Sequence, residues 1–222
     1  MLKMKKIAVI PAYNEEDRIS DVISNTKKYV DEIIVVDDGS VDDTLNKANK
    51  ANFKARHIVN MGKGCALKTG FKAALDKGAD IIITLDADGQ HDPKEIPKLI
   101  NFLKENDLDA VVGYRSENPN MPSLFKFGNN FINKALKMLF DLNVRDSQSG
   151  FRVYKVESCK DLSWNSIDYA VETEMLINLK KLGLKCGEVP IKTTYHDRYK
   201  GTTIIDGLFI FLRMLYWKMG GK

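Results

Sequence analysis

The first half of the chain alternates between short apolar runs of isoleucine and valine and longer segments with helical spacing, and this alternation limits the fold most. The expected strands are 6–10, 32–36, 56–59, 80–85 and 110–112, and the expected helices are 15–29, 41–51, 63–77 and 93–105. The strands show no polar alternation, which predicts a sheet buried on both faces, as parallel sheets are. Right-handed crossovers then predict an α/β, Rossmann-like fold, with a mostly parallel sheet flanked by helices.

The pattern changes after Gly113. Residues 125–140 and 169–182 have helical spacing, 146–154 is a polar turn entering a strand, and 185–195 is extended. The apolar tail, 207–219, predicts a C-terminal amphipathic helix. No linker or internal repeat separates these parts, so we expect a single domain, 1–222.

Charge and cysteine content narrow the function classes. The net charge of +4 suits an anionic ligand or a membrane surface and is too small to indicate nucleic acid. Cys65, Cys159 and Cys186 form no close pair, which favours a reducing compartment over a disulfide framework or zinc site. The apolar run near the N-terminus, 7–10, is too short for a signal peptide, so a cytoplasmic location is expected.

The segments after the expected strands are rich in polar residues and glycine. They are 11–15, 37–40, 60–64, 86–90 and 113–115. Ligands of open parallel sheets bind beyond the carboxyl ends of the strands. These loops, with their carboxylates, Lys63 and Arg115, therefore predict one site for a charged ligand.

Asp86, Asp88 and Gln90 follow an apolar strand at alternate positions. Side chains at such positions in extended chain point to the same side. Three oxygen donors facing one point suit Mg²⁺ or Mn²⁺, held together with phosphate oxygens of a substrate. The simpler alternative is a loop whose aspartates only cap the next helix, and Asp92 fits that role.

Two other motifs compete for this stretch. A calcium loop requires glycine at its sixth position and glutamate at its twelfth, where this chain has His91 and Pro97. The strand followed by D-x-D-G also resembles the entry motif of haloacid-dehalogenase-like phosphatases, with Asp86 as nucleophile. Gln90 stands where that motif has Thr or Val, and its downstream acidic pair is missing.

The remaining loops suit a nucleotide. Asp38 can accept a hydrogen bond from a ring N–H of uracil or guanine, and Tyr13 offers a face to the base. The alternatives are an acidic turn before a helix and a core aromatic. Lys63 either meets a phosphate or is solvated, and no ATP or dinucleotide motif is present.

Four motifs together resemble the inverting family 2 glycosyltransferases of the GT-A fold. They are 11–15 (P-A-Y-N-E), 36–40 (V-D-D-G-S), 62–64 (G-K-G) and 86–90 (D-A-D-G-Q). The segments 146–152 and 198–202 resemble those of dolichyl-phosphate mannose synthases and polyprenyl-phosphate sugar transferases.

The resemblance implies a role for each matching residue. The nucleotide-sugar site would comprise Pro11, Ala12, Tyr13, Glu15, Val36, Asp38, Lys63, Asp86 and Ala87. Asp86, Asp88 and Gln90 would bind the metal, Mg²⁺ or Mn²⁺. The residues expected to take part in catalysis are Asp88, Arg115, Asp146 and Arg198, with the two arginines at phosphate groups.

The resemblance implies transfer of a hexose, mannose above others, from GDP-mannose or a UDP-hexose to dolichyl or polyprenyl phosphate. A lipid phosphate is already anionic and needs no general base. A sugar hydroxyl on a soluble or polysaccharide acceptor would need one, and Asp146 is the candidate. A nucleotide-binding module without turnover is the third alternative.

The resemblance and the tail together divide the chain into parts. The nucleotide-sugar half is 1–115, the acceptor side is 116–201, and 202–219 is an amphipathic helix. Asp206, Arg213 and Lys218 interrupt the apolar stretch, which favours a helix lying on the bilayer over one crossing it. The protein would then be peripheral on the cytoplasmic face. Closing the core or pairing with a second subunit is the alternative for this helix.

Overall fold

The computed structural model describes residues 4–115, 123–194 and 204–221, and a seven-stranded sheet forms its centre. The strands are β1 (Lys6–Ala12), β2 (Glu32–Asp37), β3 (Phe53–Arg56), β4 (Ile81–Thr84), β5 (Ala110–Arg115), β6 (Arg152–Lys155) and β7 (Cys186–Ile191). Their order across the sheet is β3-β2-β1-β4-β6-β5-β7. β6 is antiparallel to both neighbours and every other pair is parallel, so the predicted mostly parallel sheet is confirmed.

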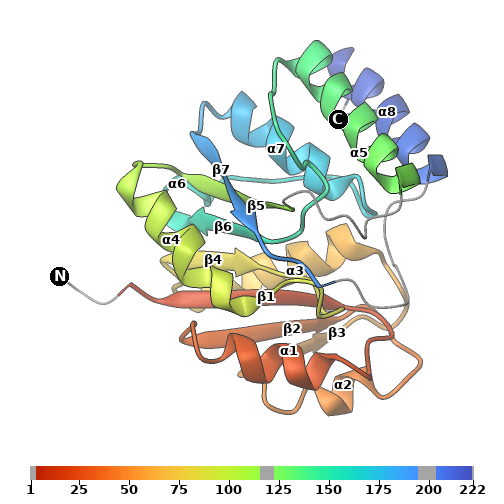
Figure 1. The fold of residues 1–222 in the computed structure, drawn as a ribbon. Coiled ribbons are helices and arrows are strands. Elements are labelled where there is room, and N and C mark those ends of the chain that lie inside the picture. The colour runs from red at the N-terminus through yellow and green to blue at the C-terminus, as the bar shows by residue number, and fades with distance from the viewer. Residues whose placement is uncertain (1–3, 116–122, 195–203, 222) are drawn as a thin grey trace.

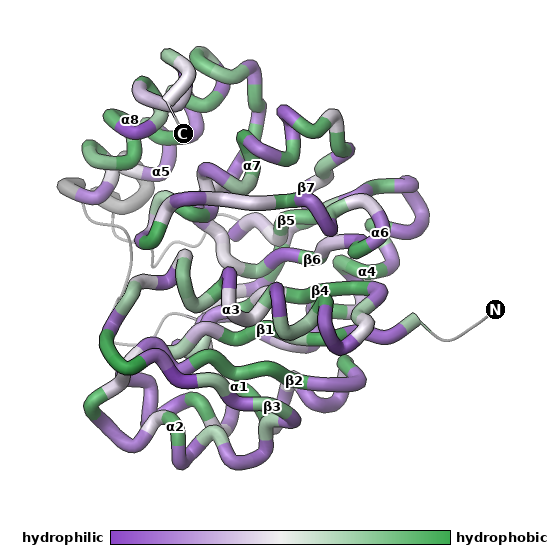
Figure 2. The backbone as a smooth tube through the Cα atoms, turned by 180° about the vertical axis from the view of Figure 1, so that it is seen from behind, coloured by the Kyte–Doolittle hydropathy of each residue, from purple (hydrophilic) through white to green (hydrophobic). Residues whose placement is uncertain are grey.

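Helices cover both faces of the sheet (Figure 1). They are α1 (Ile19–Thr26), α2 (Thr44–Lys47), α3 (Lys63–Asp76), η1 (Pro93–Glu95), α4 (Ile96–Glu105), α5 (Ser123–Phe140), α6 (Val156–Cys159), α7 (Val171–Lys181) and α8 (Ile204–Lys218). α1 and α4 pack on one face, and α3 and α7 on the other. β1, β2 and β4 are mostly apolar along their length because both faces are covered (Figure 2).

α5 and α8 lie side by side at one end of the molecule (Figure 1). Their shared core includes Ile132, Leu136, Met214 and Trp217, all buried. The predicted C-terminal helix is therefore present, with one face packed on α5. Among the described residues, no helix is both long enough and apolar enough to span a bilayer.

Three predicted elements are wrong in extent. The expected helix 15–29 shortens to α1 at Ile19–Thr26. The expected strand 56–59 is instead β3 at Phe53–Arg56, and Ile58 and Val59, which suggested it, are exposed. The expected helix 41–51 shortens to α2, which begins at Thr44. The Ser40 hydroxyl accepts from the backbone N–H of Asn14, at 2.9 Å. It thereby ties the β2–α2 turn to the loop after β1.

The position of β6 shapes the site. Its Arg152 pairs with Thr84 at the end of β4, so the polar turn 146–151 reaches the carboxyl ends of the parallel strands. The Thr84 hydroxyl donates to the Gly150 carbonyl at 2.7 Å and fixes this turn in place. The sequence predicts a strand here but not its insertion between β4 and β5.

Candidate active site

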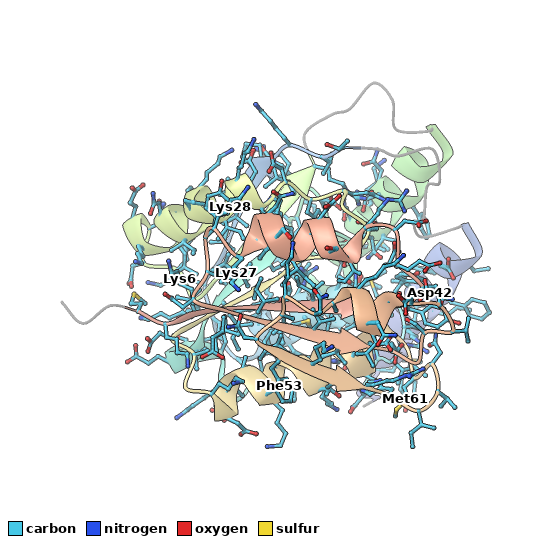
Figure 3. All side chains as sticks on the ribbon, turned by 90° about the horizontal axis from the view of Figure 1, so that it is seen from below. Lys6, Lys27, Lys28, Asp42, Phe53 and Met61 are labelled. Carbon is cyan, nitrogen blue, oxygen red and sulfur yellow. The ribbon has the colours of Figure 1, made fainter. Side chains whose placement is uncertain are left out.

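A cavity of about 760 Å³ lies at the carboxyl ends of β1, β2, β4 and β5. The expected site residues that line it are Pro11, Ala12, Tyr13, Glu15, Asp38, Lys63, Asp86, Ala87, Asp88, Gln90 and Arg115. Figure 3 shows Met61 and Asp42 at this end of the molecule, opposite Lys6 at the start of β1. Loops that are far apart in the sequence thus form one concave site.

Two expected residues are not on this cavity, and a third is not described. Val36 is fully buried in the core between the sheet and α3, so its side chain does not surround a nucleotide. Asp146 is buried beside the cavity. Arg198 lies outside the described residues.

The segment after β4 folds back on itself and aims its carboxylates into the cavity. The backbone N–H of Asp86 donates to Nδ1 of His91 at 3.3 Å, and Asp88 Oδ1 accepts from the Gln90 N–H at 2.9 Å. Asp92 caps η1 as expected, accepting from Lys94 N–H at 3.0 Å. A tight loop between a buried strand and a capped helix therefore holds Asp86 and Asp88 in place.

Asp86 and Asp88 have different electrostatic surroundings. Burial alone would raise the pKa of Asp86, but the Lys63 charge outweighs it and holds that pKa below its usual range. Burial and the negative charge of Asp86 raise the pKa of Asp88. Nearby positive charge therefore stabilises the ionised form of Asp86 more than that of Asp88.

This donor set fits a hard divalent cation. Asp86, Asp88 and Gln90 offer carboxylate and amide oxygens, and a cation would relieve the repulsion that raises the pKa of Asp88. No group of three or more His, Cys, Asp or Glu converges anywhere in the described residues, so the candidate set here consists of two carboxylates and one amide. His91 is a further residue of this loop, with no role predicted from the sequence; its buried ring supports the loop, and burial lowers its pKa.

Lys63 is an internal counterion rather than a solvated lysine. Its Nζ lies 2.6 Å from Asp86 Oδ1 and 2.7 Å from Glu172 Oε1. Burial would lower the pKa of Lys63, but the two carboxylates outweigh it and raise that pKa. Glu172, on α7, is a site residue that the sequence analysis missed, because its helix otherwise has ordinary amphipathic spacing.

The two glycines beside Lys63 allow close packing. A Cβ on Gly62 would lie 2.1 Å from the Ile167 carbonyl oxygen, and one on Gly64 would lie 1.9 Å from that of Ser166. The Gly64 N–H donates to the Ile167 carbonyl at 2.8 Å. The G-K-G motif thus seats the start of α3 against the loop before α7 and brings Lys63 to Glu172.

The two aspartates at the end of β2, Asp37 and Asp38, have different surroundings. Asp37 is fully buried and accepts from the Ser40 N–H at 3.1 Å, so it shapes the turn. Asp38 lines the cavity and accepts from His57 Nδ1 at 2.6 Å and from the Gly62 N–H at 2.7 Å. Tyr13 is 42% exposed, which excludes the alternative of a core aromatic.

Arg115, which lines the cavity, forms a two-point ion pair with Asp146. Arg115 Nε donates to Asp146 Oδ2 at 2.6 Å, and its Nη2 donates to Oδ1 at 2.9 Å. Asn129 on α5 donates to the same Oδ1 at 3.2 Å. Burial alone would raise the pKa of Asp146, but the positive charge of Arg115 outweighs burial and holds that pKa below its usual range. This geometry makes Asp146 a poor general base and a residue that positions Arg115.

Arg152 of the expected 146–152 motif is structural. It is buried and donates to the backbone carbonyls of Ser147, Ser149 and Glu172 at 2.8 to 2.9 Å. The guanidinium therefore fastens the 146–151 turn to α7. Gly150 in this turn faces Asp86, and a Cβ there would lie 2.7 Å from both carboxylate oxygens.

The sequence of a known family matches most of this site. The family model described as Glycosyl transferase family 2 matches residues 7–163. This range includes the loops after β1, β2 and β4 that line the cavity. The chain is a member of glycosyl transferase family 2. Membership excludes the phosphatase interpretation of Asp86, whose carboxylate is in any case held by Lys63.

Several family 2 relatives have names that describe a lipid phosphate. The UDP-N-acetylglucosamine–dolichyl-phosphate N-acetylglucosaminyltransferase of Methanococcus voltae is 40% identical over 239 residues, covering 96% of this chain and 95% of that one. The dolichol-phosphate mannosyltransferase of Pyrococcus furiosus is 30% identical over 234 residues, covering 97% of this chain and 65% of that one.

Solved structures confirm the GT-A fold. Glucosyl-3-phosphoglycerate synthase from Mycobacterium tuberculosis, in complex with Mn²⁺, UDP and glucosyl-3-phosphoglycerate, matches with a TM-score of 0.75 and 24% identity. The match covers 99% of this chain and 81% of that one.

Proposed function

We propose that this protein transfers a sugar from a nucleoside diphosphate sugar to a polyprenyl or dolichyl phosphate, with inversion at the sugar carbon. The Arg115–Asp146 pair carries the proposal. It presents a fixed cation to the cavity, and Arg115 lowers the pKa of Asp146, the candidate base for a hydroxyl acceptor, which makes Asp146 a weak base. An anionic acceptor is attracted by such a group and needs no base.

Each end of the cavity has its own task in this reaction. Asp38 and Tyr13 bind the nucleoside, and Asp86, Asp88 and Gln90 would hold Mg²⁺ or Mn²⁺ at the diphosphate. That cation, when bound, supplies positive charge to the departing nucleoside diphosphate. Lys63 shares its one positive charge between Asp86 and Glu172, so Asp86 and Asp88 together keep negative charge for the cation.

Arg115 binds the acceptor phosphate and directs its oxygen at the sugar carbon. Asp146 holds the guanidinium and is itself held by the Asn129 amide, so the guanidinium is oriented before the acceptor arrives. Because the acceptor approaches from the side opposite the diphosphate, the sugar carbon inverts.

UDP-N-acetylglucosamine is the donor that we place first. The N-acetylglucosaminyltransferase relative is 40% identical, whereas the P. furiosus mannosyltransferase is 30% and the undecaprenyl-phosphate mannosyltransferase of Micrococcus luteus is 28% identical. This order puts mannose, the sugar that the family resemblance favours, in second place.

The outer surface of α8 supports a lipid acceptor. Leu208, Phe209, Leu212 and Tyr216 are each more than half exposed and follow one stripe of the helix. Gly207 of α8 and Ile132 of α5 line the cavity, so this apolar stripe and the site share the same helices. A protein docked through this face would meet a lipid phosphate at the membrane surface, on the cytoplasmic side in our proposal.

The test is turnover by the purified protein. UDP-N-acetylglucosamine, GDP-mannose and UDP-glucose are each supplied with Mn²⁺ and a short polyprenyl phosphate, and Asp88→Ala is the control. We expect a lipid-linked sugar of inverted configuration that Asp88→Ala fails to make. Transfer only to a sugar hydroxyl would overturn the acceptor, and failure to bind any donor would overturn the proposed function.

A further inference from the structure

The hydrogen bonds of Asp38 leave room for one more donor. A carboxylate has about four acceptor positions. Oδ1 accepts from His57 Nδ1 at 2.6 Å and from the Met61 N–H at 3.0 Å, and Oδ2 accepts from the Gly62 N–H at 2.7 Å. Groups in the described residues thus fill three positions, and the fourth is on Oδ2 of a side chain that lines the cavity.

Two further contacts hold His57 in place. Its Nε2 lies 2.9 Å from Thr69 Oγ1 on α3, and its backbone N–H donates to the Asp37 carbonyl at 2.9 Å. Because an ionised Asp38 can only accept, Nδ1 of His57 carries a proton. In the neutral ring Nε2 then accepts from the Thr69 hydroxyl, which fixes both the tautomer and the ring orientation.

The loop between His57 and Gly62 depends on these bonds. Ile58, Val59 and Met61 are exposed, so little buried apolar surface holds the loop. Its backbone instead packs on Gly39, where a Cβ would lie 2.4 Å from the Val59 carbonyl carbon. Asn60 and Gly62 of the same loop line the cavity beside Asp38. Rotation of the Asp38 carboxylate would therefore move one wall of the cavity.

We propose that His57, backed by Thr69, is a positioning residue that fixes Asp38 to accept a hydrogen bond from the nucleobase of the donor. The last acceptor position of Asp38 then selects bases with a ring N–H at that edge, uracil or guanine. Cytosine and adenine present a lone pair there and are repelled by the carboxylate. This inference rests on the proposed function, because it concerns the nucleotide of the same donor.

Binding of four nucleotides tests the proposal. Isothermal titration of UDP, GDP, CDP and ADP, with the same Mn²⁺ concentration throughout, gives the selectivity of the wild type for UDP or GDP. We expect His57→Ala to lower this selectivity about tenfold, as for loss of a hydrogen bond to a charged group. The donor KM should rise while kcat changes little, because the reacting atoms lie at the other end of the nucleotide.

A matched pair at Thr69 separates positioning from folding. Thr69→Val keeps the shape and removes the hydroxyl, whereas Thr69→Ser keeps the hydroxyl. We expect Thr69→Val to lose selectivity and Thr69→Ser to retain it, at equal melting temperatures. Should His57→Ala fail to fold, this pair carries the test.

Three other outcomes would each overturn a different part of the proposal. A selective wild type with unchanged selectivity in His57→Ala and Thr69→Val would overturn the positioning role and leave the proposed function intact. Equal losses in Thr69→Val and Thr69→Ser would overturn the contribution of the hydroxyl. A wild type that binds none of the four nucleotides would overturn the proposed function and this inference with it.

Discussion

At the scale of single residues, Gly150 decides where the Asp86 carboxylate lies. A Cβ at residue 150 would be 2.7 Å from both carboxylate oxygens, closer than any real contact. Lys63 Nζ lies 2.6 Å from Oδ1 of the same carboxylate. Asp86 is thus confined between a glycine and a lysine that belong to different parts of the chain.

We predict that Gly150→Ala lowers kcat/KM at least tenfold, because Asp86 must leave its place. The measurement is sugar transfer to polyprenyl phosphate, with the melting temperature as a check on folding. The control is a double-mutant cycle with Asp86→Ala. If the glycine acts through Asp86, the second substitution should add little loss, and fully additive losses would contradict this route.

Asp146 should contribute to stability in a pH-dependent way. Its pKa is lowered because the buried carboxylate pairs with Arg115. Leaving one partner of such a pair uncompensated costs about 3–5 kcal/mol, so Asp146→Asn should be that much less stable at pH 7. A group whose pKa is depressed on folding stabilises the protein above its unfolded pKa, roughly 4, and loses that contribution as the pH falls.

Urea unfolding of wild type and Asp146→Asn measures this difference. The gap between the two proteins should be largest at pH 7 and should shrink as the pH falls below about 4. A gap that stays constant over this range would show that the charge of Asp146 does not stabilise the fold.

At the scale of elements, the helix pair α5–α8 has one face in the core and one exposed. Met214 and Trp217 are buried against α5, while Leu208 and Leu212 are 56% and 51% exposed. α8 therefore closes a core, as one alternative for the tail predicts, and its exposed apolar stripe leaves contact with a membrane as a prediction.

We predict that Leu208→Glu combined with Leu212→Glu weakens binding to phospholipid vesicles at least tenfold, since each buried leucine contributes roughly 1.5–3 kcal/mol. Vesicle co-sedimentation measures the loss, and UDP binding should not change. Val41→Glu is the matched control, because Val41 is 88% exposed on a different part of the surface. Retained vesicle binding together with loss of a wild-type dimer would assign the stripe to a second copy of the chain.

The elements also show how far the sequence predicts this fold. Buried strands such as β1, β2 and β4 are plain in the sequence because both of their faces are apolar. β3 is displaced because it is an edge strand with exposed residues, and exposed Ile58 next to it imitates a strand. The insertion of β6 is a tertiary pairing, which no local pattern encodes.

The site residues also divide into those that the local sequence predicts and those that only tertiary contacts place. Side chains on loops directly after buried strands, such as Asp86 and Asp38, were predictable because parallel strands bring those loops together. Glu172 and Gly150 were not, since each acts through a neighbour that is distant in the sequence. Val36 was misplaced because a residue at a strand end can face either the cavity or the core.

At the scale of the whole molecule, the two halves of the cavity share one sheet. β6 of the second half lies between β4 and β5 of the first. The indole N–H of Trp164 donates to the Gly64 carbonyl at 2.9 Å, and Lys63 reaches Glu172 on α7. Because neither half has a sheet of its own, we predict that residues 1–222 unfold as one cooperative unit.

The two tryptophans of the chain make this prediction measurable. Trp164 reports on the core between α3 and α7, and Trp217 reports on the α5–α8 pair. Urea unfolding of Trp164→Phe and Trp217→Phe is followed by fluorescence of the remaining indole and by far-ultraviolet circular dichroism. If the chain is a single cooperative domain, the fluorescence and dichroism midpoints should coincide within each variant. The midpoints of the two variants should then differ only because the two substitutions change the stability by different amounts. If Trp217 reports an earlier transition that dichroism shows only in part, α5–α8 is a separate unit attached to the sheet, and the single-domain prediction is wrong.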